Sequence, residues 1–411
     1  MIHPNGFRQQ IVDFVTSQSS SQTGEYMMGP GGQVTLYASC FAAMTLHYLG
    51  ALPEQKTEKR RDWAAYIQKW QDPDTGLFLG PEVLGTEITH PKHDWEHVTM
   101  HLTAHVLPAL HLLGEQPRCH LRFAHRFLDV RILNEWLTAR DWSDAWLEGN
   151  NLLFVGQFLI HLRDRERRAE AEQALKYYFD WLDDQVDPHT GLWGTNAQAS
   201  IPVAIYGAYH QLLVYHYAQR PVRHATRIMD LVLEMQHQDG SFMIGGGGGA
   251  CEDLDGVDML VNLYKQTGYR PLAVRRALRR ALDSVLSQLV DNSGFVYRKR
   301  SPMNLLGLSR TNIAPNTADL FSTWFRVHTL ALIFQVIQEY PLSRINWQFN
   351  HVCSMGWHRP DGLPTPQPDP WQDRIALSFL QKEMNHLWIN SLLGRAATRL
   401  KNSIVYRMRH N

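Results

Sequence analysis

Four carboxylates stand close together in one segment of the chain, Cys251-Glu-Asp-Leu-Asp-Gly-Val-Asp258. The segment follows the glycine run 245–249 and has the pattern of a helix start. Capping and the helix dipole explain one or two acids at such a place, but not four. Crowded carboxylates repel one another, so one of them keeps its proton to higher pH and can act as a general acid. The sequence therefore predicts catalytic roles for Glu252, Asp253, Asp255 and Asp258.

Histidines at four-residue intervals form the second candidate group, because a helix places such residues along one face. They are His93, His97, His101 and His105. A His-x3-His pair suits two ligands of a metal ion, but the sequence indicates no third ligand, so we expect no metal site. We expect His97 or His101 instead to hydrogen-bond an acidic residue across the fold and to set its protonation. Packing explains His105 equally well.

Polar and aromatic side chains near the starts of neighbouring predicted helices complete the candidate site. Rings and amides of this kind could line a cavity, although aromatic residues at helical spacing more often belong to a core. The predicted substrate-binding residues are His93, Trp95, Asn150, Asn151, Phe154, Tyr206, Tyr209, Asp319, Trp324 and Phe325.

The elements that must position these groups are helices. Nearly the whole chain shows amphipathic helical patterns separated by turns rich in Gly, Pro and Asp, which predicts an all-α protein. One turn phrase recurs with its glycine at positions 76, 191, 240 and 294. The intervals are 115, 49 and 54 residues, so we expect a degenerate copy near Trp136–Trp146. A repeat of about fifty residues fits a helical hairpin that stacks on its neighbours.

The hairpins divide into two layers. The helices that follow each turn are rich in aromatic and small residues, and we place them inside, at 31–49, 93–113, 150–162, 200–217, 252–265 and 316–338. The more charged helices form the outer layer, at 7–18, 58–71, 121–138, 165–186, 221–237 and 271–290. The prediction is an (α/α)6 toroid over residues 1–360. Residues 361–411 are predicted to form a Pro-rich linker and a C-terminal helix, about 371–400, packed on the toroid.

The repeated turn resembles the Gln-Trp motif of the terpenoid cyclase and protein prenyltransferase superfamily. Tyr66-Ile-x3-Gln71-x4-Gly76-x-Phe78 fits that motif in full, and Leu231-Val-x3-Gln236-x3-Gly240-x-Phe242 fits apart from its first aromatic residue. In that superfamily the motif ties outer helices of a toroid together. Six-hairpin glycosidases carry similar turns, so the phrase supports the toroid more firmly than it supports one chemistry.

A second resemblance concerns the acidic segment. In class II cyclases an Asp-x-Asp-Asp motif opens an inner helix, and here Asp253-Leu-Asp255-Gly256 does so, with Gly256 in place of the last aspartate. The middle aspartate of that motif protonates an alkene or epoxide. The resemblance therefore implies acid-initiated cyclisation of a prenyl substrate, with Asp255 as the proton donor.

Two other functions fit the same residues. In a carbohydrate-active toroid, aromatic rings would stack on sugars while Asp94 or Glu96 and Asp253 or Asp255 act as acid and base. In a non-catalytic toroid, the concave face would bind a lipid or a protein, and the acids at 252–258 would not be strongly perturbed.

Composition narrows the partners. Lys and Arg number 40 and so do Asp and Glu, so the net charge is zero and we expect no nucleic-acid partner. No apolar run is long enough for a transmembrane helix, although peripheral membrane contact stays open. The four cysteines form no Cys-x-x-Cys pair and the N-terminus has no apolar stretch, which favours a cytoplasmic enzyme acting on a small molecule.

We expect no required cofactor, and Mg²⁺ only if the substrate is a diphosphate. Asp183-Asp-Gln-Val-Asp187 spells the magnesium-binding sequence of class I terpene synthases, but it lies in a repeated turn, and we assign it to turn formation. Two segments stay open in interpretation. The glycine run 245–249 suits either close approach of a ligand or a long turn, and residues 347–360 suit either a lid or a packed strap.

Overall fold

A ring of helices makes up the protein. The computed structural model describes residues 3–84 and 92–358. Within these ranges, the sheet consists of two short antiparallel strands, β1 (Tyr26–Met27) and β2 (Val34–Thr35). The same ranges contain no helix that is long and apolar enough to cross a membrane.

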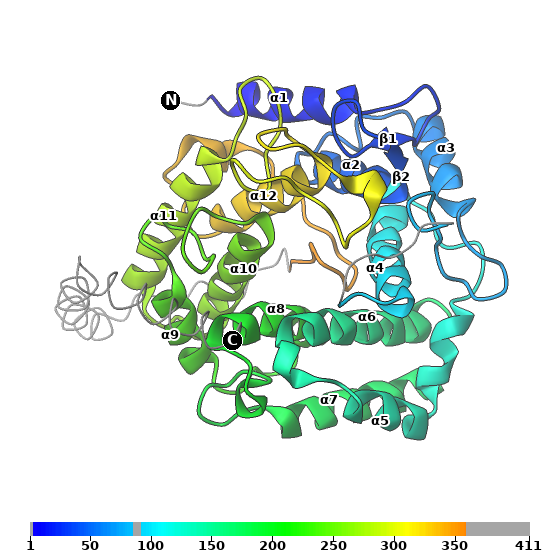
Figure 1. Ribbon diagram of the computed structural model, residues 1–411, viewed down its shortest axis with the longest axis vertical. Coiled ribbons are helices and arrows are strands. Elements are labelled where there is room, and N and C mark those ends of the chain that lie inside the picture. The colour runs from blue at the N-terminus through cyan, green and yellow to red at the C-terminus, as the bar shows by residue number, and fades with distance from the viewer. Residues whose placement is uncertain (1–2, 85–91, 359–411) are drawn as a thin grey trace, which may run out of the picture.

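Among the described residues, six helices form the inner layer. They are α2 (Leu36–Tyr48), α4 (Trp95–Leu113), α6 (Ala145–Asp164), α8 (Ile201–Tyr217), α10 (Ala250–Thr267) and α12 (Leu320–Ile333). Each packs against the next, and α12 packs against α2, so the ring closes (Figure 1). The predicted all-α toroid is confirmed.

The outer layer contributes one helix before each inner helix. It consists of α1 (Pro4–Ser17), α3 (Thr57–Gln68), α5 (Val130–Thr138), α7 (Glu170–Gln185), α9 (Ala225–Met235) and α11 (Pro271–Ser287). Short 3-10 helices lie in the connections: η1 (Arg122–Leu128), η2 (Trp142–Asp144), η3 (Thr195–Ala197), η4 (Ser309–Thr311) and η5 (Pro341–Arg344). The predicted outer helix 121–138 is therefore two pieces. The side chain of Asp129 accepts the backbone N–H of Arg131 at 2.8 Å and starts α5.

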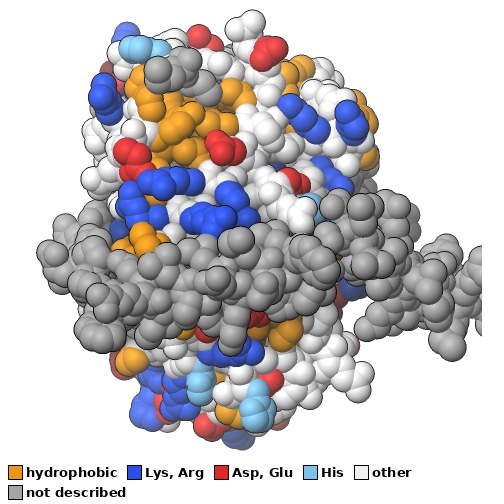
Figure 2. Space-filling model, turned by 90° about the vertical axis from the view of Figure 1, so that its left-hand side faces the viewer, with side chains coloured by type: hydrophobic (Ala, Val, Ile, Leu, Met, Phe, Trp, Pro, Cys, Tyr) orange, Lys and Arg blue, Asp and Glu red, His pale blue; other side chains and the backbone are white. Residues whose placement is uncertain are grey.

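Burial explains the two layers. Every residue of α12 is buried, as expected for a helix surrounded by protein. An outer helix such as α9 buries one face, which includes Ile228, Leu231 and Val232. On the side of the molecule where α9 and α11 lie, Lys and Arg side chains gather at the surface (Figure 2).

The glutamine turns tie successive hairpins together. The amide nitrogen of Gln71 donates to the carbonyls of Gly76 (3.1 Å) and Cys119 (2.8 Å), and its oxygen accepts the Cys119 N–H at 2.9 Å. Gln236 bonds Gly240 and Ala277 in the same way, each at 2.9 Å. Gly240 has φ +88°, and a Cβ there would lie 2.2 Å from a carbonyl oxygen of the next outer helix. These turns therefore need glycine.

One predicted turn is absent and another was missed. Near Trp136–Trp146, α5 is followed by η2, and this connection contains neither the glutamine nor the glycine of the repeated turn. A further copy lies instead after α1, where Ser19 pairs with Tyr26 and Gly24 has φ +88°. The predicted linker and C-terminal helix over 361–411 lie outside the described residues.

Candidate active site

A cavity of about 300 Å³ opens where the inner helices begin. Six predicted site residues lie on its wall: His93, His97, His101, Asn150, Asp255 and Phe325. The sequence analysis did not single out Lys92, Asp144, Trp146, Leu147, His210, Cys251, Leu305, Leu306, Phe321 and Met355, which complete the wall. Two of these carried a signal, since His210 lies one helical turn after Tyr206 and Phe321 one turn before Phe325.

Asp255 is the buried acid of this cavity. Its side chain projects from the second turn of α10 and is 1% exposed. Its Oδ2 atom has no hydrogen-bond partner among the described residues. Burial raises the pKa of Asp255 well above its usual value, and the nearby Glu252, Asp258 and Asp253 raise it further. Both effects favour the protonated form of Asp255, the form that can donate a proton.

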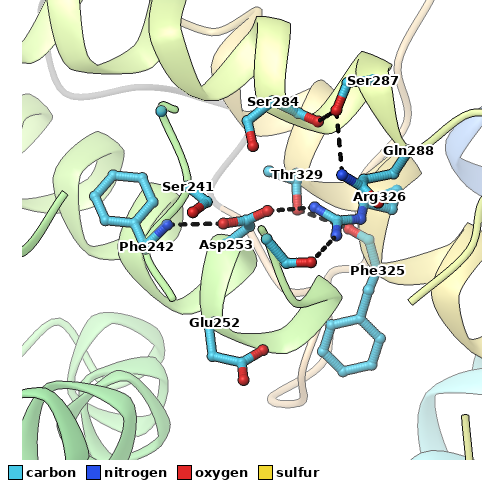
Figure 3. A network of polar contacts seen from close by, with 12 residues as sticks. Ser241, Phe242, Glu252, Asp253, Ser284, Ser287, Gln288, Phe325, Arg326 and Thr329 are labelled. Carbon is cyan, nitrogen blue, oxygen red and sulfur yellow. Dashed lines mark hydrogen bonds and ion pairs between the residues drawn. The ribbon is translucent and has the colours of Figure 1, made fainter. Parts of the chain in front are cut away.

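Asp253 has a different environment although it is two residues away. It forms an ion pair with the fully buried Arg326 of α12 and accepts the backbone N–H of Phe242 at 2.8 Å (Figure 3). Arg326 also donates to the carbonyls of Gly248 (3.2 Å) and Tyr297 (2.8 Å). These contacts hold the start of α10 against α12, and Asp253 does not line the cavity.

Glu252 and Asp258 also lie off the cavity wall. Glu252 accepts the hydroxyl of Tyr297 at 2.8 Å. Asp258 accepts the amide of Asn262 at 2.9 Å, its Oδ2 has no partner among the described residues, and burial raises its pKa to about 7. Of the four predicted acids, only Asp255 faces the cavity.

The hydrogen bonds of His97 define its tautomer. Its Nδ1 lies 2.8 Å from Oδ1 of Asn151, whose amide nitrogen donates to Glu148 at 3.0 Å. Because the amide nitrogen is used by Glu148, the amide oxygen faces His97, and Nδ1 must carry the hydrogen. In its neutral form, His97 then has its lone pair on Nε2. The sequence predicted a direct hydrogen bond between a histidine and an acid. In the structure the amide of Asn151 lies between His97 and Glu148.

Two further histidines on the wall are neutral. Burial lowers the pKa of His210 to about 4, and its Nδ1 donates to the carbonyl of Tyr206 at 2.7 Å, so the lone pair is on Nε2. Burial and the neighbouring histidines lower the pKa of His101 well below its usual value. The Tyr37 hydroxyl, whose pKa is raised by burial, lies 2.7 Å from Nδ1 of His101 and donates to it.

Several predicted substrate-binding residues lie behind the wall or away from it. Asn151 orients His97, and Phe154 packs on the rings of His97 and His101 with centroids 5.7 and 5.5 Å away. Trp95 does not line the cavity because its side chain turns outward, where the residue is 45% exposed.

Three of the other four have contacts that fit a structural role, and the fourth, Tyr209, is buried with no hydrogen-bond partner for its hydroxyl among the described residues. Tyr206 donates its hydroxyl to the carbonyl of Phe242 at 2.8 Å, and Asp319 caps α12 by accepting the N–H of Ser322 at 2.7 Å. Trp324 stacks on Phe41 in the core, and Tyr209 is fully buried. None of these four side chains lines the cavity.

Contacts in turns account for the aspartates of the 183–187 motif and for the glycine run 245–249. Asp187 accepts the N–H of His189 at 2.9 Å within its own turn, and Asp183 pairs with Arg220 at 2.9 Å. In the part of the chain that the structure describes, no cluster of three or more His, Cys, Asp or Glu could hold a metal ion. The glycine run forms a turn with positive φ from Gly245 to Gly248, which Asp239 holds through the N–H of Gly247 at 2.6 Å.

The segment after α12 enters the ring instead of covering it. Its described part ends at His358, and it is drawn in orange at the centre of Figure 1. Met355 lines the cavity that holds Asp255. Val352 and Cys353 line a second cavity, of about 410 Å³, at the other ends of α4, α6 and α8. The described part of the segment is therefore packed inside the ring, as a strap would be, and does not form a lid over the mouth.

A family-model match supports the architecture. The family model of the prenyltransferase alpha-alpha toroid domain matches residues 7–131 and 117–261. Similar solved structures include a polysaccharide lyase, with a TM-score of 0.45 and 11% identity over 80% of this chain and 97% of that chain. They also include a protein from Actinoplanes, with a TM-score of 0.42 and 12% identity over 81% and 99%. No curated protein matches the sequence significantly.

Proposed function

Because this chain belongs to the prenyltransferase alpha-alpha toroid domain family, we propose that it is a terpenoid-cyclase-like enzyme in which Asp255 protonates a prenyl substrate. One observation carries the proposal: a buried carboxyl with a raised pKa and imidazoles with lowered pKa values lie on the wall of one cavity whose other residues are largely apolar. Acid and base are thus separated by the space that a substrate would fill.

The first step is proton transfer from Asp255. The π electrons of an alkene form a new C–H bond as the O–H bond breaks, which leaves a carbocation on the substrate and a carboxylate on Asp255. A buried carboxylate is costly by itself, but here it forms opposite a cation in a medium of low dielectric constant. The raised pKa of Asp255 favours the protonated form that this step requires.

The cavity wall suits a carbocation. Phe321, Phe325 and Trp146 present aromatic rings, whose negative faces attract positive charge. Leu305 and Leu306 help to exclude water, which would otherwise capture the cation. After ring closure, the Nε2 lone pair of His210 or of neutral His97 removes a proton from a neighbouring carbon, and the C–H electrons form the new alkene. Return of that proton to Asp255 completes an isomerisation.

The ligand requirements follow from this scheme. It needs no cofactor, and Mg²⁺ would accompany the substrate only if the substrate carried a diphosphate. At the rim, Lys92 forms an ion pair with Asp144.

A carbohydrate-active enzyme is the second candidate, because Asp144 places a second carboxylate on the wall with Asp255. The carboxylates that the sequence analysis paired with Asp253 or Asp255 for glycan chemistry, Asp94 and Glu96, have other contacts. Asp94 caps α4 by accepting the N–H of His97 at 2.8 Å, and Glu96 forms an ion pair with Arg126 at the surface. A glycan mechanism would therefore have to use Asp144 or a neutral histidine as the base.

The test is a product screen by mass spectrometry. Purified wild type, Asp255→Asn and the control Asp164→Asn, which alters an acid of the second cavity, are each offered prenyl diphosphates, squalene and a panel of uronate and neutral oligosaccharides. We expect a cyclic terpenoid from wild type and from the control, and about 10²- to 10⁴-fold less product from Asp255→Asn.

Three results would contradict the proposal. Cleavage of an oligosaccharide alone would favour the carbohydrate enzyme. Binding of prenyl chains without turnover would favour a lipid-binding toroid. Full cyclase activity in Asp255→Asn would place the proton donor elsewhere.

A further inference from the structure

The segment from Phe349 to His358 closes the ring from within. It is anchored to the inner helices at several points. The carbonyl of Phe349 bonds Nε2 of His47 at 3.0 Å, and Tyr48 donates its hydroxyl to the carbonyl of Gly356 at 2.6 Å. At its end, His358 lies 2.8 Å from the amine of Lys265 on α10. We call this segment the plug.

The plug also has an internal framework. The backbone N–H of Asn350 donates to the carbonyl of Gly356 at 3.3 Å, and the Asn350 amide donates to the Ser354 hydroxyl at 2.8 Å. Gly356 has φ +97°, and a Cβ there would lie 2.9 Å from the Tyr48 hydroxyl. The backbone of the plug is therefore held in one place, and a change in one of its side chains should alter the cavity locally.

The two sides of the plug face different spaces. Met355 contributes to the wall of the cavity with Asp255, whereas Val352 and Cys353 contribute to the second cavity. The first cavity uses the early residues of the inner helices, such as His97 on α4 and Asn150 on α6. The second uses later residues of the same helices, such as His111 and His161. The plug thus lies between two cavities stacked along the ring axis.

We propose that Met355 is the floor of the candidate active site and limits the length of the prenyl chain that the cavity accepts. The inference rests on the proposed function for the kind of ligand. The physical argument is steric: the thioether side chain of Met355 is 7% exposed on the wall of the first cavity, and the residues just before it in the plug line the second. A shorter side chain would lengthen the first cavity in that direction, and a larger one would shorten it.

Binding of unreacted alcohols tests the inference without requiring turnover. Isothermal titration calorimetry of the full chain with geraniol, farnesol, geranylgeraniol and a C30 polyprenol gives the preferred length for wild type. In Met355→Ala, we expect the preferred length to increase by one isoprene unit, with about tenfold tighter binding of the longer chain, as burial of about two more methylene groups would produce. Met355→Trp should shift the preference to a shorter chain.

Two matched variants serve as controls. Met355→Leu keeps the volume and should keep the preferred length. Val352→Ala shortens a side chain on the other side of the plug and should also leave the length unchanged. The melting temperature of each variant shows whether it is folded, and Met355→Trp keeps the test decisive if Met355→Ala does not fold.

The outcomes separate the inference from the proposed function. A shift of the preferred length in opposite directions for Met355→Ala and Met355→Trp supports the inference, even if no cyclic product is ever found. Cyclase activity with an unchanged preferred length in both variants overturns the inference and leaves the proposed function standing. If wild type binds none of the alcohols, the inference is also wrong.

Discussion

The two cavities lie at opposite ends of the same inner helices but contain different chemistry. Around Asp255 the wall is largely apolar. Burial raises the pKa of Asp255 and lowers that of His210, and Lys92 pairs with Asp144. The second cavity has Arg165 and Arg167, which are exposed, together with His111, His161, Asp164 and His351. Both ends are rich in titratable residues, so composition does not distinguish them. The degree of burial at each end determines which groups carry charge.

The same contrast appears within one turn of α10. Asp253 and Asp255 are both buried, but Asp253 has Arg326 and a backbone N–H as partners, whereas Oδ2 of Asp255 has none among the described residues. Asp253 is therefore suited to holding the fold, and Asp255 is suited to proton transfer. Four variants test these contrasts.

The largest effect on stability is expected for Arg326→Ala. Removing this side chain leaves Asp253 buried without its partner, which should lower the free energy of unfolding by about 3–5 kcal/mol. At the other end of the ring, the exposed Arg167→Ala should cost less than about 0.5 kcal/mol. Urea denaturation measures both. Pairing Arg326→Met with Asp253→Asn should recover much of the loss, and equal losses for the two arginine variants would contradict the contrast.

The next effect is the pH dependence of stability due to Asp258. Its pKa is about 7 in the folded state, above the unfolded value of about 3.9. The stabilising contribution of Asp258 to the free energy of unfolding is therefore complete below about pH 4 and is lost as the pH rises through 7. In Asp258→Asn this loss disappears, so the variant should gain about 1–3 kcal/mol relative to wild type between pH 4.5 and about 7.5. A difference in unfolding free energy that does not vary with pH would show that burial of Asp258 does not shift its pKa.

A smaller effect is expected for the residue that orients His97. Asn151→Leu removes the acceptor of the His97 Nδ1 hydrogen, so the ring can rotate or change tautomer. We expect about tenfold lower kcat with little change in KM, since a positioned base contributes to the transition state more than to binding. Steady-state kinetics on the substrate found in the product screen measures this. A change confined to KM would mean that Asn151 helps to bind substrate instead.

The smallest effect is the pH dependence of stability due to His161, a residue of the second cavity. Its sign is opposite to that for Asp258. Burial lowers the pKa of His161 to about 4, below the unfolded value of about 6.5. The stabilising contribution of His161 to the free energy of unfolding is present above about pH 6.5 and is lost as the pH falls through 4. Wild type should therefore lose about 1 kcal/mol relative to His161→Gln between pH 7 and pH 5. Guanidinium denaturation at the two pH values checks the sign, which should be the reverse of that for Asp258→Asn.

The architecture follows from local patterns in the sequence. Inner helices such as α12 are rich in aromatic and small residues, whereas outer helices such as α9 have one apolar face, so a two-layer ring is the arrangement that buries both. Glutamine turns like that at Gln71 added the spacing of the hairpins. The one misplaced copy, near Trp136, has a connection without glycine. The copy at Gly24 has no aspartate between its glutamine and its glycine, unlike the other four copies. The local sequence pattern was sufficient to predict the fold because each hairpin packs on its neighbours alone.

The candidate site depended on tertiary structure. The sequence predicted the same role for Asp253 and Asp255. Only the fold places Arg326, 73 residues away, against Asp253. It also places Asn151 against His97, across 54 residues, and inserts Met355 from beyond the last inner helix. The physical reason is that protonation and cavity shape depend on partners and burial supplied by distant segments. A single segment of sequence specifies which groups are present, and the closed ring decides which of them are neutral, paired or facing the cavity.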